Sequence, residues 1–242
     1  MSSLTLTAKP PVPPTVTPPV SREFDDLYFS AENGLAESAF VFLAGNNLPH
    51  GWQQKSRFVI GETGFGTGLN FLAAWKLFDE TAAPPHTLDF ISFEKYPLRS
   101  EIIRPHLQPY SAGFDGRLQK LLDRYPPIIP GFHRLVLSER VTLTLIFEDV
   151  NAAIPKLDTA GDMAVDAWFL DGFKPATNPD MWHPALFAQM ARLSRKGTRL
   201  STYTAAGQVR RDLAAAGFTV QKAPGFGRKR HMTTGIYDGE NP

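Results

Sequence analysis

Between residues 57 and 72 the sequence reads Arg57-Phe58-Val59-Ile60-Gly61-Glu62-Thr63-Gly64-Phe65-Gly66-Thr67-Gly68-Leu69-Asn70-Phe71-Leu72. A short apolar strand is followed directly by a glycine-rich turn and by the apolar start of a helix. The glycines at 64, 66 and 68 allow a tight turn and let a ligand approach bare backbone. This order of strand, turn and helix predicts a loop that binds a nucleotide-type cofactor.

The glycine spacing argues against a dinucleotide. A dinucleotide fingerprint would have its third glycine where this chain has Leu69. The pyrophosphate of a dinucleotide also binds a helix N-terminus that favours anions, whereas this strand ends in an acid, Glu62. A carboxylate beside the loop suits a ligand with a cationic centre and an amino group, and so favours S-adenosylmethionine over NAD. Taken alone, the loop is also compatible with a turn that binds nothing.

Apolar segments with strand and helix patterns alternate along the rest of the chain. Strands are predicted at 58–60, 88–94, 141–147, 167–170, 198–203, 218–222 and 232–237, and helices at about 180–194 and 206–216. This alternation is typical of an α/β fold with a mostly parallel sheet and helices on both faces. Residues 99–136, which are interrupted by prolines, are predicted to form an inserted helical or lid segment over the sheet edge.

The ends of the chain bear on its location. The proline-rich residues 1–20 predict a disordered leader, followed by one domain over residues 21–242. The leader lacks the continuous apolar run of a secretory signal, and no segment approaches the roughly 20 apolar residues of a membrane span. We therefore expect a cytoplasmic protein with no membrane partner.

Cysteine is absent from the 242 residues. Disulfides, Cys-ligated zinc, iron–sulfur clusters and thiolate nucleophiles are thereby excluded. The six histidines show no ligand-like spacing, so no metal site is expected.

Four successive predicted strands end in acids, namely Glu62, Glu94, Asp149 and Asp171. Ligands of open α/β sheets bind outside the carboxyl ends of the strands, so these acids should converge on one crevice. Glu94 is placed to accept hydrogen bonds from two ribose hydroxyls, and Asp149 from an adenine amino group. An acid where a strand becomes a turn is also common without any ligand, and for Asp149 alone that interpretation is preferred.

The last of these acids opens the segment Asp171-Gly172-Phe173-Lys174-Pro175-Ala176-Thr177-Asn178-Pro179-Asp180-Met181-Trp182. The rings of Phe173 and Trp182 are candidates to stack on a base, although two core aromatics explain them equally well. Methyl transfer to nitrogen needs an amine lone pair, which an aliphatic ammonium lacks. Asp171 is therefore the predicted catalytic group, orienting an amine and taking its proton.

Positive charge is concentrated near the C-terminus. The net charge is only +1, yet residues 186–232 contain ten Lys or Arg and a single acid, Asp212. This distribution predicts a surface for a phosphate backbone, with a solvated charged face as the alternative.

The chain resembles the methyltransferase domain of the bacterial tRNA 5-methylaminomethyl-2-thiouridine biosynthesis bifunctional protein family. The stretches that carry the resemblance are residues 61–72, Ser92-Phe93-Glu94-Lys95-Tyr96-Pro97-Leu98, residues 171–182, Pro224-Gly225-Phe226-Gly227-Arg228-Lys229-Arg230, and Phe24-Asp25-Asp26-Leu27-Tyr28-Phe29-Ser30 with Asn33-Gly34-Leu35-Ala36-Glu37. The similarity runs from about Val20 to Tyr237, and the 171–182 segment is more specific than the glycine loop.

This resemblance implies a class I S-adenosylmethionine-dependent methyltransferase fold. Such a fold is Rossmann-like, with a mostly parallel seven-stranded sheet and an antiparallel C-terminal strand. It also implies methylation of the aminomethyl nitrogen of 5-aminomethyl-2-thiouridine at the tRNA wobble position.

Site residues are carried over by position. The resemblance implies that the cofactor contacts Glu62, Gly64, Gly66, Thr67, Gly68, Asn70, Glu94, Lys95, Asp149 and Asp171, with Asp171 at the reacting amine. The residues predicted to contact the substrate or tRNA are Glu37, Phe173, Lys174, Arg228, Lys229 and Arg230. Thr63 replaces the leucine of the family pattern, a difference expected to matter little beside the glycines.

Bifunctional members carry a second, FAD-dependent domain that makes the amine by removing a carboxymethyl group. No flavin fingerprint occurs before Pro242, so we expect no FAD in this chain and a fused or separate FAD-dependent oxidoreductase as a possible partner. The chain is then either a stand-alone enzyme or part of a longer protein. Two other functions stay open: methylation of a different amine, against which the basic segment argues, and non-catalytic RNA binding by a domain with this fold.

Overall fold

The computed structural model describes residues 18–21, 23, 26–27, 33–157 and 164–239. Most of the predicted leader, residues 1–17, lies outside the described residues, as do residues 24–25 and 28–32 of the N-terminal motif. Strand β1, Val20–Ser21, pairs antiparallel with β2, Asp26–Leu27, in a small separate sheet. The predicted leader therefore overlaps this pairing at Val20.

The main sheet has eight strands in the order β5-β6-β4-β3-β7-β8-β10-β9. Their bounds are β3 Arg57–Glu62, β4 Thr87–Phe93, β5 Gly131–Val136, β6 Val141–Phe147, β7 Val165–Phe169, β8 Ser194–Thr202, β9 Phe218–Pro224 and β10 His231–Tyr237. Strands β6, β4, β3, β7 and β8 run parallel, and β10 runs antiparallel to both of its neighbours. The predicted α/β fold with an antiparallel C-terminal strand is thus confirmed, with one strand more than the seven expected.

The additional strand, β5, pairs antiparallel with β6 at the sheet edge. It lies at the end of the segment predicted as an insertion, which also contains α4, Ser100–Leu107, and α5, Arg117–Arg124. Residues such as Ile103 and Leu121 of these helices are fully buried in the core. Residues 131–136 of this segment thus form a strand rather than the predicted helical or lid structure, and the role of α4 and α5 as a lid stays a prediction.

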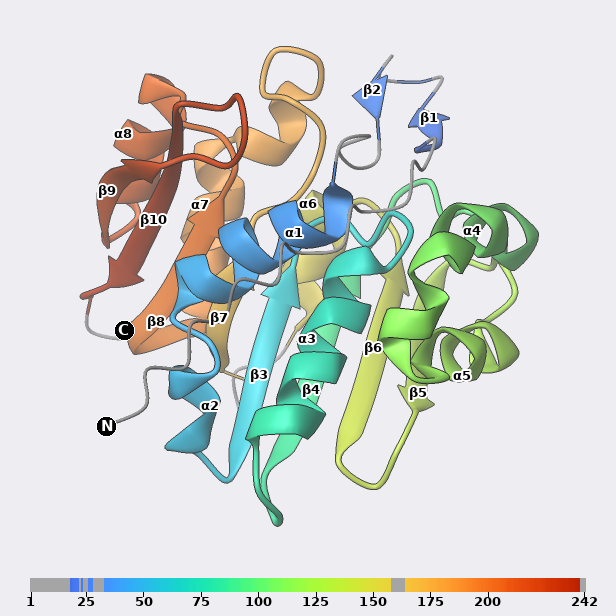
Figure 1. Cartoon of the computed structure of the whole chain (residues 1–242). Helices are drawn as coiled ribbons and strands as arrows, with labels where there is room; N and C mark the ends of the chain where they lie inside the picture. The colour runs from blue at the N-terminus through green and yellow to red at the C-terminus, as the bar shows by residue number, and fades with distance from the viewer. Residues whose placement is uncertain (1–17, 22, 24–25, 28–32, 158–163, 240–242) are drawn as a thin grey trace, which may run out of the picture.

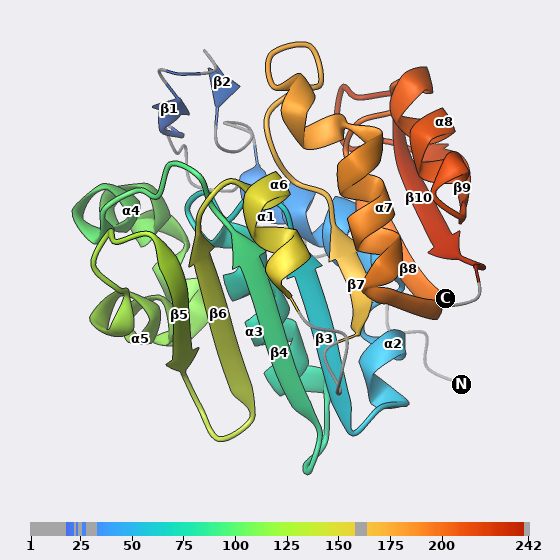
Figure 2. The same cartoon turned by 180° about the vertical axis from the view of Figure 1, so that it is seen from behind.

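Helices cover both faces of the sheet (Figures 1 and 2). On one face lie α1 Gly34–Ser38, α2 His50–Gln53, α3 Leu69–Thr81, α4 and α5. On the other lie α6 Val150–Ala153, α7 Pro184–Arg192 and α8 Gly207–Ala215. Each face has its own apolar core, as the sequence alternation predicts. Of the helices in the described ranges, none is long and apolar enough to cross a membrane.

The central strands are buried on both faces. Every residue of β7 is buried, and β3 is buried from Phe58 to Glu62. Gly61 of β3 lies beside Trp168 of β7, and a Cβ at position 61 would stand 2.4 Å from the indole carbon Cζ3. The indole is held by its ring N–H, which donates to the Ser194 hydroxyl at 3.0 Å. Only glycine fits between these two strands.

We therefore expect Gly61→Ala to lower the free energy of unfolding by about 1–3 kcal/mol, because the methyl group must displace a fixed and fully buried indole. Urea denaturation measures the change. Gly113→Ala is the matched control, since a Cβ at position 113 meets no atom within 4 Å. An equal effect of the two substitutions would contradict the packing argument.

The parallel strands place their carboxyl ends at one edge of the sheet. Glu62 is the last residue of β3, and the loops that follow β4, β6 and β7 at this edge carry Glu94, Asp149 and Asp171. The sheet thus brings together groups that are up to about a hundred residues apart in sequence, as Glu62 and Asp171 are.

Candidate active site

The loops at this edge enclose a cavity of about 430 Å³. Its lining includes these predicted site residues: Gly64, Gly66, Thr67, Asn70, Glu94, Lys95, Asp149, Asp171, Glu37, Phe173, Lys174, Arg228 and Lys229. The cavity volume falls within the roughly 300–1,000 Å³ of small-molecule sites. Three of the predicted residues, Glu62, Gly68 and Arg230, do not line it.

The glycine turn packs tightly against the loop after β7. A Cβ on Gly64 would lie 3.1 Å from the backbone oxygen of Asp171, which also accepts a 2.6 Å hydrogen bond from the Thr63 hydroxyl. Gly68 has a φ of +82° at the start of α3, behind the ring of Phe65. Gly64 therefore keeps the two loops close together, whereas Gly68 shapes the turn without facing the cavity.

Glu94 holds the glycine turn in place. One carboxylate oxygen accepts from the Gly66 N–H at 2.8 Å, and the other accepts from the Tyr96 N–H at 2.9 Å. Burial raises the pKa of Glu94 above its ordinary value, and the two N–H groups partly offset that rise. Because each carboxylate oxygen can accept a further hydrogen bond, the predicted ribose contact stays compatible with this role.

Glu62 lies below the cavity rather than in its wall. Its side chain is fully buried and accepts from the Asn70 amide at 2.9 Å and from the Ser92 hydroxyl at 2.6 Å. Burial, followed by the nearby charge of Asp171, raises the pKa of Glu62 well above its ordinary value. The predicted direct contact of Glu62 with a cofactor in the cavity therefore does not fit, because β3 points its carboxylate into the core.

A single amide joins Glu62 to Asp171. The side-chain nitrogen of Asn70, in the first turn of α3, donates to Glu62 and also to Asp171 at 2.7 Å. The second oxygen of Asp171 accepts from the Gly172 N–H at 2.8 Å. Burial raises the pKa of Asp171 to about 6, although the Asn70 and Gly172 hydrogen bonds act in the opposite direction. Asp171 is thus a positioned carboxylate that can exchange a proton near neutral pH.

Asp149 is engaged in local contacts. Its carboxylate caps α6 by accepting from the Asn151 N–H at 2.9 Å, and it pairs with Lys95 at 2.8 Å. Burial would raise the pKa of Asp149, but the hydrogen bonds from Lys95 and Asn151 outweigh burial and lower it. The hydrogen bond with Asp149 is the largest cause that raises the pKa of Lys95. Both residues line the cavity, and their contact with adenine stays a prediction.

The two aromatic candidates differ. Trp182 is buried, and its ring N–H donates to the backbone oxygen of Phe173 at 2.9 Å. Phe173 lines the cavity, whereas Trp182 does not. The packed Trp182 ring thus lies in the core, as the alternative interpretation expects, and stacking on a base stays a prediction for Phe173.

Tyr203 is a cavity residue that the sequence analysis missed. It follows the carboxyl end of β8, and its hydroxyl donates to the backbone oxygen of Gly172 at 2.6 Å. Tyr203 follows the fifth parallel strand, and ligands of such sheets bind outside the carboxyl ends of the strands. That position is the signal in the sequence that points to Tyr203.

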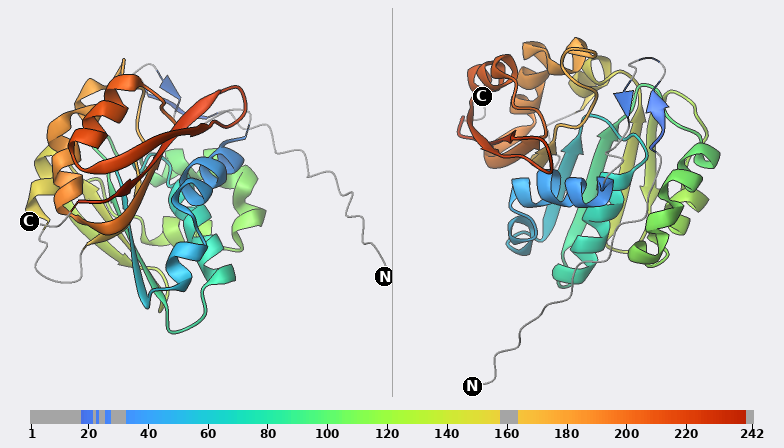
Figure 3. Two further views of the ribbon diagram at one scale, coloured as in Figure 1. Left: turned by 90° about the vertical axis from the view of Figure 1, so that its left-hand side faces the viewer. Right: turned by 45° about the horizontal axis from the view of Figure 1, so that its top comes forward.

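The connection between β9 and β10, here called the basic hairpin and comprising residues 225–230, reaches across to α1 (Figure 3). The ammonium of Lys229 lies 2.7 Å from a carboxylate oxygen of Glu37 and 4.4 Å from the centre of the Tyr203 ring. This contact joins Glu37 to a position 192 residues further along the chain. Within the described part of the chain, no group of three or more His, Cys, Asp or Glu is arranged to hold a metal ion.

Comparisons with known proteins agree with this geometry. Residues 112–238 match a sequence family described as S-adenosyl-L-methionine-dependent methyltransferase. The chain is 49% identical over 227 residues to the tRNA 5-methylaminomethyl-2-thiouridine biosynthesis bifunctional protein MnmC of Aliivibrio fischeri, with 90% of this chain and 33% of that protein covered. It is 48% identical over 232 residues to the protein of the same name from Ralstonia nicotianae, with 95% and 34% covered.

A solved structure shows the same fold. The crystal structure of MNMC2 from Aquifex aeolicus superposes with a TM-score of 0.73 at 24% identity, covering 92% of this chain and 68% of that one. The chain spans about a third of the length of the two curated relatives. With more than half of its residues matched to one family, this chain belongs to the S-adenosyl-L-methionine-dependent methyltransferases.

Proposed function

We propose that this chain transfers a methyl group to the aminomethyl nitrogen of 5-aminomethyl-2-thiouridine at the tRNA wobble position. The observation that carries the proposal is Asp171, a positioned carboxylate beside the glycine turn in the cavity wall. The two curated relatives, whose names refer to 5-methylaminomethyl-2-thiouridine in tRNA, support the same substrate.

The cavity fits S-adenosylmethionine. Gly64 and Gly66 give close access to backbone, and Glu94 can accept hydrogen bonds from a ribose. Lys95 and Asp149 also line the cavity, and we propose that the adenine binds beside them. When bound, the cofactor supplies a methyl group on a positively charged sulfur.

Asp171 prepares the accepting amine. An alkylamine such as a lysine side chain has a pKa of roughly 10, so it reaches the site mostly as an ammonium without a lone pair. A carboxylate with a pKa of about 6 is ionised at neutral pH, and it can both hold the ammonium and accept its proton. The protein therefore contributes orientation and a proton acceptor.

The tRNA surface is proposed at the cavity mouth. Arg228 and Lys229 line the cavity, and all three basic residues 228–230 are exposed. Other members of the basic 186–232 segment lie elsewhere: Arg195 and Lys196 stand at the start of β8, at the opposite end of the sheet. The fold thus divides a segment that is continuous in sequence, and only part of it faces the site.

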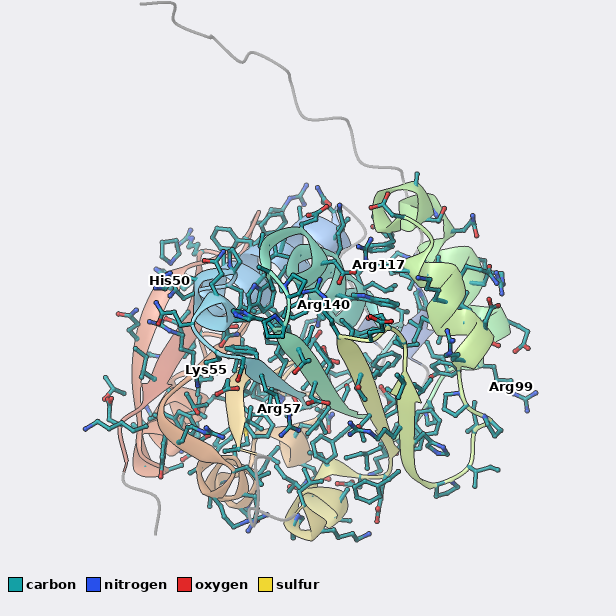
Figure 4. The ribbon with its side chains drawn as sticks, turned by 90° about the horizontal axis from the view of Figure 1, so that it is seen from below. His50, Lys55, Arg57, Arg99, Arg117 and Arg140 are labelled. Atoms are coloured by element: carbon teal, nitrogen blue, oxygen red, sulfur yellow. The ribbon has the colours of Figure 1, made fainter. Side chains whose placement is uncertain are left out.

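At that opposite end, several basic side chains are paired with acids. Figure 4 shows this side of the molecule, with Lys55, Arg57, Arg117 and Arg140 labelled. Lys55 pairs with Asp166, Arg57 pairs with Asp89 at 2.6 Å, and both Arg117 and Arg140 pair with Asp79. Paired cations attract phosphate weakly, and Lys229 of the basic hairpin is itself paired with Glu37. The basic hairpin is proposed as the tRNA surface because it is exposed and borders the cavity.

Charge reversal at Arg228, Lys229 and Arg230 should weaken tRNA binding and flatten its salt dependence. For each phosphate that the protein no longer neutralises, the slope of log affinity against log salt falls by about 1. Fluorescence anisotropy with labelled tRNA over a salt series measures the slope. The matched control reverses Arg195 and Lys196, and it should leave the slope unchanged. Equal slopes for the two variants would place the tRNA surface elsewhere.

The activity itself is tested with methyl-labelled S-adenosylmethionine. The protein is incubated with tRNA that carries the aminomethyl group and, separately, with the same tRNA already methylated there. Nucleoside analysis should find label on the aminomethyl nitrogen of the first tRNA only. Label on another nucleoside, or label found only on an amine that is not part of tRNA, would assign a different substrate.

We also propose an oxidoreductase partner that makes the amine, fused to this domain or separate from it. The length of the curated relatives, about three times the matched region, and the word bifunctional in their name support this proposal.

A further inference from the structure

An ammonium group already occupies one part of the cavity wall, and it belongs to Lys229. The ammonium is 2.7 Å from Glu37 and 4.4 Å from the Tyr203 ring centre. A cation within about 6 Å of a ring face is attracted by the ring. The Glu37 side chain is only 14% exposed, whereas that of Lys229 is 49% exposed. Glu37 and Tyr203 therefore belong to the wall of the cavity, whereas Lys229 reaches them from the exposed basic hairpin.

The ring of Tyr203 is held in position. Its hydroxyl donates to the backbone oxygen of Gly172, and the N–H of Gly172 donates to Asp171. Glu37 comes from α1, whose first residues are ordered by the Asn33 side chain accepting from the Ala36 N–H at 3.0 Å. Glu37 and Tyr203 are thus each held by contacts that do not involve Lys229.

Glu37 and Tyr203 line the same cavity as Asp171, and the Tyr203 hydroxyl contacts the residue that follows Asp171. Beside the dominant effect of burial, the charge of Glu37 raises the pKa of Asp171 and the charge of Lys229 lowers it. An ammonium at this position therefore interacts with both carboxylates. A substrate ammonium bound there would be close to the group that is to take its proton.

We propose that Glu37 and Tyr203 form the subsite for the primary ammonium of the substrate, and that Lys229 occupies this subsite until tRNA binds. The proposal rests on the proposed function, because that function requires an amine substrate attached to a polyanion. Phosphates drawn to Arg228 and Arg230 also attract Lys229, which moves with the basic hairpin and leaves the subsite open. Lys229 thereby closes the site to small amines that carry no phosphate.

Binding of a small amine tests the subsite without any methyl transfer. The probe is the nucleoside 5-aminomethyluridine, titrated by calorimetry into the full chain saturated with S-adenosylhomocysteine. Lys229→Met should bind the probe at least tenfold more tightly than wild type, since affinity scales with the fraction of molecules in which the subsite is open. Lys229→Gln serves as a second variant, and retained S-adenosylhomocysteine affinity shows that each variant is folded.

The subsite residues are tested in the Lys229→Met background. Adding Glu37→Gln or Tyr203→Leu should abolish the gain in affinity, whereas Tyr203→Phe keeps the ring and should retain most of it. Lys222→Met, the same change on an exposed lysine of β9 outside the cavity, should bind the probe as weakly as wild type.

The two proposals fail in different ways. Equal probe affinity in wild type and Lys229→Met, or a gain that survives Glu37→Gln, would overturn the subsite and assign Lys229 a purely structural ion pair. Failure of the proposed function would appear instead as a lack of methyl transfer by wild type to aminomethyl tRNA.

Discussion

Asp171→Asn should reduce methyl transfer to aminomethyl tRNA by about 10²–10⁴, the usual contribution of a positioned base. Asparagine keeps the shape of the side chain, but it cannot hold an ammonium by charge or take its proton. The affinities for S-adenosylmethionine and for tRNA should change much less, because the substitution removes an interaction needed during the reaction. Single-turnover kinetics at saturating tRNA measures the loss.

The pH profile separates a base from a residue that only shapes the loop. In wild type the rate should rise as pH increases through about 6, where Asp171 loses its proton, and continue to rise until the bound amine is deprotonated. The limb near pH 6 should disappear in Asp171→Asn. Asp212→Asn, the same change on α8, should keep both the rate and the profile. A near-normal rate for folded Asp171→Asn would assign the proton transfer to another group, with Glu37 or a water as the next candidate.

Glu94→Ala should weaken S-adenosylmethionine binding by about 1–3 kcal/mol, or roughly 5- to 150-fold. The alanine removes the proposed ribose acceptor and also frees the N–H groups of Gly66 and Tyr96, so that the glycine turn loses its support. Isothermal titration calorimetry measures the affinity. Amide hydrogen exchange should become faster at Gly66 and Tyr96.

Glu94→Gln serves as the comparison. Glutamine offers one acceptor oxygen in place of two, and should therefore lie between wild type and alanine. Since burial raises the pKa of Glu94, wild-type affinity should also fall as pH decreases through that raised value, whereas the glutamine variant should show no such dependence. Unchanged affinity of Glu94→Ala would remove Glu94 from the cofactor site.

The sequence was most informative where the chain is regular. The apolar run at 58–60 followed by alternating glycines predicted β3, the turn and the start of α3, because burial on both faces leaves a continuous apolar signature. The rule that ligands bind at strand ends then located the cavity from four acids. All four acids lie at the edge of the sheet that this rule predicted.

What the sequence could not give was the direction of each side chain. Glu62 lies in a strand, where alternate residues point to opposite faces, and it proved to face Asn70 and Ser92 in the core. Strand β5 escaped prediction because an edge strand exposes Phe132 and Val136, which breaks the pattern of a buried strand. The contact of Lys229 with Glu37 depends on how the basic hairpin folds over the sheet, which no local pattern encodes.

The burial of Asp171 and Glu62 makes the stability of the folded chain depend on pH. Asp171 has a pKa of about 6 in the folded protein and an ordinary value of 3.8, so between these pH values the folded chain binds more protons than the unfolded chain. Stability therefore falls as pH rises through this window, and the raised pKa of Glu62 acts in the same direction. Without a bound ligand, the protein is therefore less stable at the pH where Asp171 is ionised and able to accept a proton. A bound cation near these carboxylates would relieve their repulsion, which makes thermal protection by a cationic ligand greater at neutral than at acidic pH.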